Sequence, residues 1–130
     1  TNWLIKKAKK DKRIWLLTGD LGYSFFEKFA KLFSDRFVNC GIIEQSMVGI
    51  ACGLALMGKK PFVYSASTFL IFKALEQIRN DIGYQNLDVT LVGHAGISYN
   101  FLGYTHLPYK NEDLKILKAI RKKIKYIRLK

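Results

Sequence analysis

Short candidate strands alternate with amphipathic stretches along most of this chain, and this alternation most constrains its fold. Candidate strands, each closed by polar residues or glycine, occupy residues 14–17, 36–39, 61–64 and 89–92, with a last one around 124–129. Apolar residues at helical spacing predict helices at residues 3–10, 25–33, 44–57, 70–84 and 111–120. This repetition predicts an α/β fold of three layers (α/β/α), in which helices cover both faces of a mainly parallel sheet.

Polar residues that could take part in binding or catalysis follow the predicted strands. Asp20 comes after the first strand, Glu44 after the second, residues 65–68 after the third and His94 after the fourth. Open parallel sheets bind ligands beyond the carboxyl ends of their strands, and those ends lie along one edge. We therefore expect these residues to converge on one rim.

Glu44 is the strongest single candidate for chemistry. It opens a predicted helix directly after a strand, and Ile42, Ile43, Met47 and Val48 are its apolar neighbours. A carboxyl in such surroundings can share a proton with a ring nitrogen. The pattern alone favours the alternative, an acidic residue that the helix dipole stabilises in the first turn.

Two further pairs of residues have both a functional and a structural interpretation. Gly49 and Gly53 lie inside the same predicted helix, where each glycine costs about 1 kcal/mol relative to alanine. They indicate either the close approach of another backbone or ligand, or tight packing on the sheet. Phe69 and Phe72, three residues apart, would share a helix face and either stack on a flat heterocycle or belong to the core.

His94 and His106 are the only histidines. At a rim they can donate to sugar hydroxyls or exchange protons near neutral pH, or they can be ordinary polar surface. Neither has a cysteine or glutamate at ligand spacing, so the case for zinc is weak. The chain also lacks the GxxxxGK[ST] and GxGxxG loops of nucleotide-binding proteins.

The net charge of +12, from 22 Lys and Arg against 10 Asp and Glu, raises the alternative of a nucleic-acid-binding protein. The cations crowd at the two ends, within residues 6–13 and 115–130. This distribution is typical of solvated helix faces and termini, so nucleic-acid binding is the less favoured hypothesis.

The sequence also predicts a cytoplasmic protein without membrane contact. No apolar run is long enough to span a bilayer, and residues 1–12 lack the apolar segment of a signal peptide. Cys40 and Cys52 stand in no CxxC or CxxH spacing, so we expect two reduced thiols.

Several motifs in this order and spacing resemble the pyrimidine-binding domain of the transketolase family. The likeness covers about residues 15–117, and residues 96–99 (GISY) with Leu102-Gly103 make it closest to the C-terminal half of split, two-chain transketolases. The motifs are residues 17–22 (LTGDLG), 35–45 (DRFVNCGIIEQ), 49–55 (GIACGLA), 61–64 (PFVY), 76–82 (EQIRNDI) and 103–106 (GYTH), with Phe69, Phe72 and Glu112-Asp113.

The resemblance implies that thiamine diphosphate is the cofactor. In the family, the glutamate that matches Glu44 hydrogen-bonds N1′ of the cofactor's aminopyrimidine, and proton exchange there prepares the cofactor to attack a ketose carbonyl. Phe69 and Phe72 match the aromatic residues that pack on the pyrimidine ring. Asp20 matches an acidic residue near the cofactor at the dimer interface.

The resemblance also implies the transfer of a two-carbon ketol unit between sugar phosphates. His94 and His106 match substrate-contacting, catalytic histidines, and Ser24 matches a phosphate-side contact. The chain departs from the family pattern at two substrate-side positions. Leu102 stands where many transketolases have an acidic residue that contacts substrate hydroxyls, and Tyr104 replaces the usual proline before Thr-His.

Finally, the resemblance implies an active site shared between two polypeptides. Thiamine-diphosphate enzymes hold Mg²⁺ and the diphosphate with Gly-Asp-Gly and a distant Asn, a pattern that Gly19-Asp20-Leu21 does not complete. We expect residues 1–130 to form one pyrimidine-binding domain, with the diphosphate-binding and C-terminal transketolase domains absent. Such a chain would be inactive alone and would need a diphosphate-domain subunit in a homo- or hetero-oligomer. The alternative is a non-catalytic α/β interaction module derived from that domain.

Overall fold

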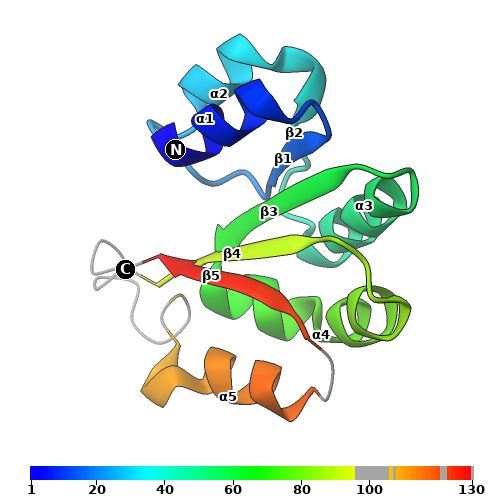
Figure 1. Cartoon of the computed structure of the whole chain (residues 1–130). Helices are drawn as coiled ribbons and strands as arrows, with labels where there is room; N and C mark the ends of the chain where they lie inside the picture. The colour runs from blue at the N-terminus through cyan, green and yellow to red at the C-terminus, as the bar shows by residue number, and fades with distance from the viewer. Residues whose placement is uncertain (96–105, 107, 121–122, 130) are drawn as a thin grey trace.

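A five-stranded sheet with every neighbouring pair parallel forms the centre of the molecule (Figure 1). The computed structural model describes residues 1–95, 106, 108–120 and 123–129. The strand order is β2-β1-β3-β4-β5. The strands are β1 (Ile14–Thr18), β2 (Phe37–Asn39), β3 (Lys60–Ala66), β4 (Thr90–His94) and β5 (Lys125–Leu129). This architecture confirms the predicted α/β fold.

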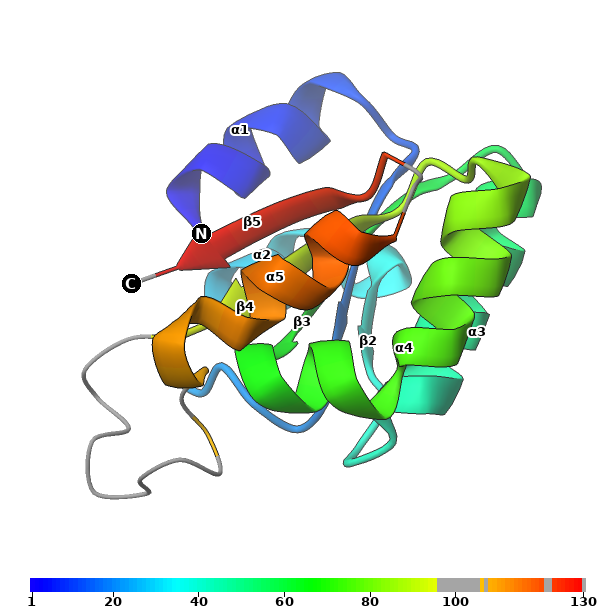
Figure 2. The same ribbon diagram turned by 90° about the horizontal axis from the view of Figure 1, so that it is seen from below.

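Helices cover both faces of the sheet (Figure 2). Two lie on one face: α1 (Asn2–Lys10) and α2 (Glu27–Leu32). On the other face lie α3 (Glu44–Leu56), η2 (Phe69–Lys73), α4 (Leu75–Gln77), η3 (Ile78–Tyr84) and α5 (Glu112–Ala119). From β1 to β2 the chain moves toward one edge of the sheet, and from β2 through β3 and β4 to β5 it moves toward the other edge. Because strand–helix–strand crossovers are right-handed, α2 lies on the opposite face of the sheet from the later helices. The short η1 (Ser34–Arg36) and η5 (Tyr109–Asn111) precede β2 and α5.

The alternation of side chains along each strand divides the core into two clusters. Leu17 and Val63 point toward α3 and the later helices. Leu16 and Phe62, one residue earlier on the same strands, point toward α1 and α2. Such burial on both faces explains why the strands are nearly continuous apolar runs in the sequence.

The segment predicted as one helix over residues 70–84 differs in detail. It begins at Phe69, and two π-helical stretches flank the three-residue α4. Leu70, Ala74, Ile78 and Ile82 are buried along it at helical spacing. The spacing of apolar residues does not determine whether the backbone hydrogen bonds join residues four or five apart. The sequence therefore did not predict the π-helical turns.

No helix in the described part of the chain combines the length and the apolar character needed to cross a membrane.

Candidate active site

The strand ends line up at one edge of the sheet, as the sequence predicted. Thr18 pairs with Asn39 on one side and with Tyr64 on the other, and Ala66 pairs with His94. The polar residues that follow these positions therefore share the same rim of the molecule.

Glu44 is the first residue of α3 and is almost fully buried, with 2% of its surface exposed. The Oγ of Ser65, at the end of β3, donates to its Oε1 at 3.1 Å. The Nζ of Lys73 donates to its Oε2 at 3.3 Å and forms an ion pair with it. These two contacts satisfy a buried carboxylate that would otherwise be costly to desolvate.

Lys73 links Glu44 to the aromatic residue at the same rim. Its ammonium lies 4.5 Å from the centroid of the Phe69 ring. That ring and the imidazole of His106 form an edge-type contact, with the ring centroids 4.6 Å apart and the planes at 64°. The structure thus brings Glu44, Phe69 and His106 into one continuous set of contacts around a lysine that the sequence did not identify.

Phe72 does not share this arrangement. Its side chain is 37% exposed, and no ring contact to it is found among the described residues. Lys73, four residues after Phe69, packs on the Phe69 ring. The position of Phe72 beside the cofactor stays a prediction.

Asp20 and His94 form a second group at the rim. Both line a hollow of about 280 Å³, with Tyr64 on its wall. Asp20 adopts a left-handed backbone conformation with φ of 55°, and Asn39 holds it by donating to Oδ1 and accepting from its backbone N–H. Partial burial lowers the pKa of His94, which favours the neutral imidazole.

Gly19 joins the two groups. A Cβ at this position would lie 3.4 Å from the backbone oxygen of Gly41 and 3.6 Å from Oγ of Ser65. The turn that carries Asp20 therefore packs directly against the residue that holds Glu44. Ser24, by contrast, is exposed on the following loop and lines neither hollow near Asp20; its backbone N–H donates to Glu27.

A buried polar cluster braces the rim just before Phe69. Asp113 on α5 is fully buried, and its Oδ2 accepts hydrogen bonds from Ser67 at 2.6 Å and from Tyr126 at 2.8 Å. Arg128 completes the cluster, with Nε 3.4 Å from the same oxygen. Burial raises the pKa of Tyr126, so its hydroxyl keeps its proton. The cluster ties α5 and β5 to the chain two residues before Phe69.

The outer face of α3, beside Glu44, is apolar and exposed. Ile50 is 45% exposed and Leu56 is 66% exposed. A Cβ added at Gly49 or Gly53 would meet nothing within 4 Å. Packing against the described residues therefore does not explain these glycines, and the close approach of another backbone or a ligand stays a prediction.

The sequence placed Ser65 at the rim among residues 65–68, but it did not predict its contact with Glu44. Asn39 and Lys73 were not identified, although Asn39 ends β2 and its position at the carboxyl edge was a usable signal. Lys73 carried no such signal, because it lies inside a helical segment and not at a strand end. The two cysteines lie outside the site, and burial raises the pKa of Cys52 to about 11, consistent with an unreactive thiol.

The fold and the rim together define an α/β domain that presents a buried carboxylate beside an aromatic ring at the carboxyl edge of a parallel sheet. Residues 1–128 match the family model described as "Transketolase, pyrimidine binding domain". The chain belongs to the transketolase family, through this pyrimidine-binding domain.

Similar proteins and solved structures support the same family assignment. The chain is 38% identical over 121 residues to an apulose-4-phosphate transketolase subunit of Phocaeicola vulgatus, covering 92% of this chain and 38% of that protein. It is 42% identical over 119 residues to a putative transketolase C-terminal section of Methanocaldococcus jannaschii, covering 90% and 37%. A structure described as a split gene transketolase in an inactive β4 tetramer superposes with a TM-score of 0.77 at 30% identity, over 98% of this chain and 48% of that one. The chain thus spans little more than a third of the length of these two relatives.

Membership in this family implies dependence on thiamine diphosphate, and the described residues fit one part of that cofactor. Glu44 offers a buried carboxylate oxygen next to the Phe69 ring, which suits a flat heterocycle with a basic ring nitrogen. Within residues 1–95, 106, 108–120 and 123–129, no group of three His, Cys, Asp or Glu side chains could hold a metal ion.

Proposed function

We propose that this chain forms the pyrimidine side of the active site of a thiamine-diphosphate-dependent enzyme that transfers a two-carbon ketol unit between sugar phosphates. The observation that carries the proposal is the buried Glu44 carboxylate, linked through Lys73 to the face of Phe69 at the open rim. In this proposal Phe69 packs on the aminopyrimidine, Asp20 lies near the cofactor, and His94 and His106 contact the sugar.

Glu44 would act by holding and exchanging one proton at a ring nitrogen. Ser65 fixes Oε1 and so orients the carboxylate, which leaves Oε2 for the ring. Lys73 now occupies both Oε2 and the face of Phe69, so it must move aside when the ring enters. The bound cofactor supplies the carbanion chemistry, and the chain supplies orientation and the proton.

The proposal also requires a partner. The diphosphate and its Mg²⁺ would be held by a subunit that carries the diphosphate-binding domain, and the exposed face of α3 is the surface we assign to it. Gly49 and Gly53 leave room there for a closely packed backbone, beside exposed Ile50. The resulting enzyme would be a cytoplasmic hetero-oligomer, or a homo-oligomer of longer chains that contain both domains.

The test is reconstitution with a diphosphate-domain subunit. We expect ketol transfer from xylulose 5-phosphate only when both chains are present, and we expect Glu44→Gln to lower kcat by at least about 100-fold, the usual contribution of a positioned acid or base. Glu76→Gln is the matched control, because Glu76 is exposed on α4. Full activity of the Glu44→Gln pair would refute the catalytic role. A complex that assembles but never binds thiamine diphosphate would favour the non-catalytic interaction module.

A further inference from the structure

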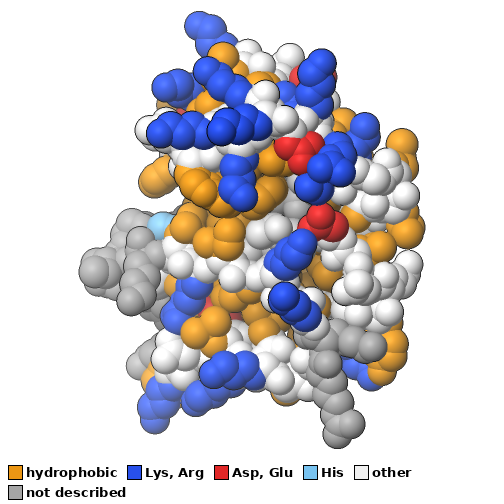
Figure 3. Space-filling view, viewed as in Figure 1, with side chains coloured by type: hydrophobic (Ala, Val, Ile, Leu, Met, Phe, Trp, Pro, Cys, Tyr) orange, Lys and Arg blue, Asp and Glu red, His pale blue; other side chains and the backbone are white. Residues whose placement is uncertain are grey.

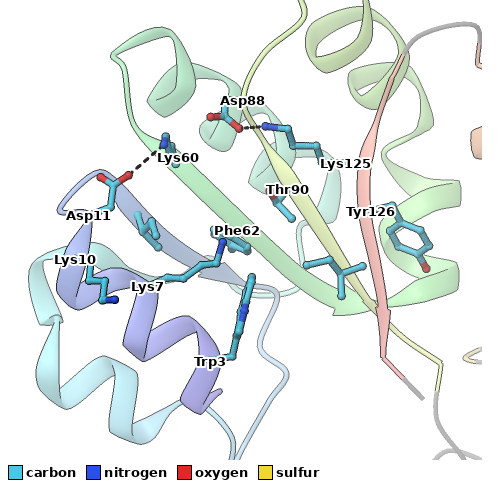
Figure 4. A pocket seen from close by; sticks show the side chains of 12 residues that line it. Trp3, Lys7, Lys10, Asp11, Lys60, Phe62, Asp88, Thr90, Lys125 and Tyr126 are labelled. Atoms are coloured by element: carbon cyan, nitrogen blue, oxygen red, sulfur yellow. Dashed lines mark hydrogen bonds and ion pairs between the residues drawn. The ribbon is translucent and has the colours of Figure 1, made fainter.

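An open groove lies on the face of the sheet opposite α3, α4 and α5, between α1 and β5 (Figure 4). Two adjoining hollows of about 560 Å³ and 400 Å³ form it, and Trp3, Phe62 and Ile127 line both. The larger hollow lies toward the amino ends of the strands, away from the rim that carries Glu44 and Asp20.

The floor of this groove is apolar and regular. The strand register places Tyr64 beside Val92, and Val92 beside Ile127, across β3, β4 and β5. Side chains alternate along a strand, so Phe62 lies on the same face two residues earlier. Leu129, which is 40% exposed, lines the far end.

The dimensions of the groove suit one short helix. Neighbouring strands lie about 4.8 Å apart, so β3 to β5 spans about 10 Å. Phe62 and Tyr64 on β3 are already buried against Trp3 and Phe26, so a bound helix would lie mainly over β4 and β5. The five residues of β5 extend over about 13 Å, the length of about nine helical residues. Parallel sheets are normally covered on both faces. Among the described helices only α1 and α2 lie on this face, and Trp3 of α1 is left 52% exposed.

The rim of the groove is predominantly basic, and lysines lie around the hydrophobic middle of this face in the space-filling view (Figure 3). Asp11 and Asp88 also line the rim, but each is paired with a rim lysine. Another lysine lies over the Trp3 ring, 4.7 Å from its centroid. The rim lysines are Lys7, Lys10, Lys60 and Lys125.

We propose that this groove binds an amphipathic helix of a partner polypeptide, with an apolar side toward the sheet and acidic residues along its flanks. A second copy of this chain is a poor occupant, because each copy has a net charge of +12 and a lysine-rich α1. A nucleic acid would satisfy the lysines, but its phosphates would leave the apolar floor uncovered. The acidic amphipathic helix satisfies both parts of the surface.

Trp3 provides a direct probe of occupancy. In a Trp15→Phe variant it is the only remaining tryptophan, since the chain has two. We would titrate this full chain with a synthetic helical peptide of about 15 residues, long enough to form a helix, with a leucine stripe flanked by glutamates. The matched peptide has lysine in place of each glutamate. We expect the acidic peptide to shift Trp3 emission to the blue and to bind at least about tenfold more tightly than the basic one.

Reversing the charge of two lysines at the edge of the groove tests whether the groove binds an acidic helix. Lys7→Glu with Lys10→Glu should weaken the acidic peptide about tenfold, whereas Lys28→Glu with Lys31→Glu on α2, outside the groove, should not. Equal binding of the two peptides, no binding of either, or equal effects of both double variants would overturn the proposal. A concentration-dependent blue shift of Trp3 with dimer formation in sedimentation would identify a second copy as the occupant. Displacement of the acidic peptide by a single-stranded oligonucleotide would identify nucleic acid.

Discussion

Replacing Gly49 by alanine should stabilise the isolated chain. Gly49 lies inside α3, and a Cβ there would meet nothing within 4 Å. The substitution therefore removes the helix-propensity penalty of glycine, about 1 kcal/mol, without adding a clash. For a domain of 130 residues, that free energy raises the Tm by about 4 °C. Thermal unfolding followed by circular dichroism measures the shift.

The matched control is Gly22→Ala. Gly22 has φ of +91°, and a Cβ there would lie 2.4 Å from the ring of Phe26, so this variant should unfold at a lower temperature than the wild type. An unchanged or lower Tm for Gly49→Ala would refute the claim that the outer face of α3 is free. If the Tm rises, the same variant should bind the diphosphate-domain subunit more weakly, because the added methyl group occupies the space left for the partner's backbone.

Three further substitutions test other parts of the site. Asp113→Asn removes the charge that faces Arg128 inside the protein and should lower the free energy of unfolding by about 3 kcal/mol, as urea denaturation would show; a change below about 0.5 kcal/mol would exclude the bracing role. Lys73→Met should let the isolated chain bind thiamine more tightly in calorimetry, because the amine no longer competes for Glu44 and Phe69; weaker binding would mean that Lys73 helps to hold the ring. Burial lowers the pKa of His94 below its usual 6.5, so the unfolded chain binds this proton more readily and stability should fall as the pH drops below that value. His94→Gln should reduce the loss of stability between pH 7.5 and pH 5.5, and an identical pH profile for the variant would contradict this assignment.

The main architecture could be predicted from the sequence because burial on both faces of a parallel sheet leaves a strong signal. The run at residues 61–64 shows where a buried strand lies. The burial of Glu44 was only one of two interpretations, because the pattern alone favoured an acidic residue stabilised by the helix dipole, and its neighbours Ile42 and Ile43 are exposed. The convergence of Asp20, Glu44 and His94 on one edge follows from the parallel order alone.

The fine structure of the site could not be predicted in the same way. The contact between Lys73 on η2 and Glu44 on α3 joins residues 29 positions apart, which local apolar spacing does not encode. Ser67 and Asp113 are 46 positions apart, and no local sequence motif predicts a hydrogen bond over that distance.

The brace between Ser67, Asp113 and Tyr126 has a consequence for how the molecule matures. Glu44 and Phe69 are synthesised before α5 and β5, which supply two of the three groups that fix the strand exit next to Phe69. During translation, the ring-binding residues would therefore emerge while the Ser67 hydroxyl is still unsupported. A nascent chain would acquire its competent rim only after α5 and β5 have docked.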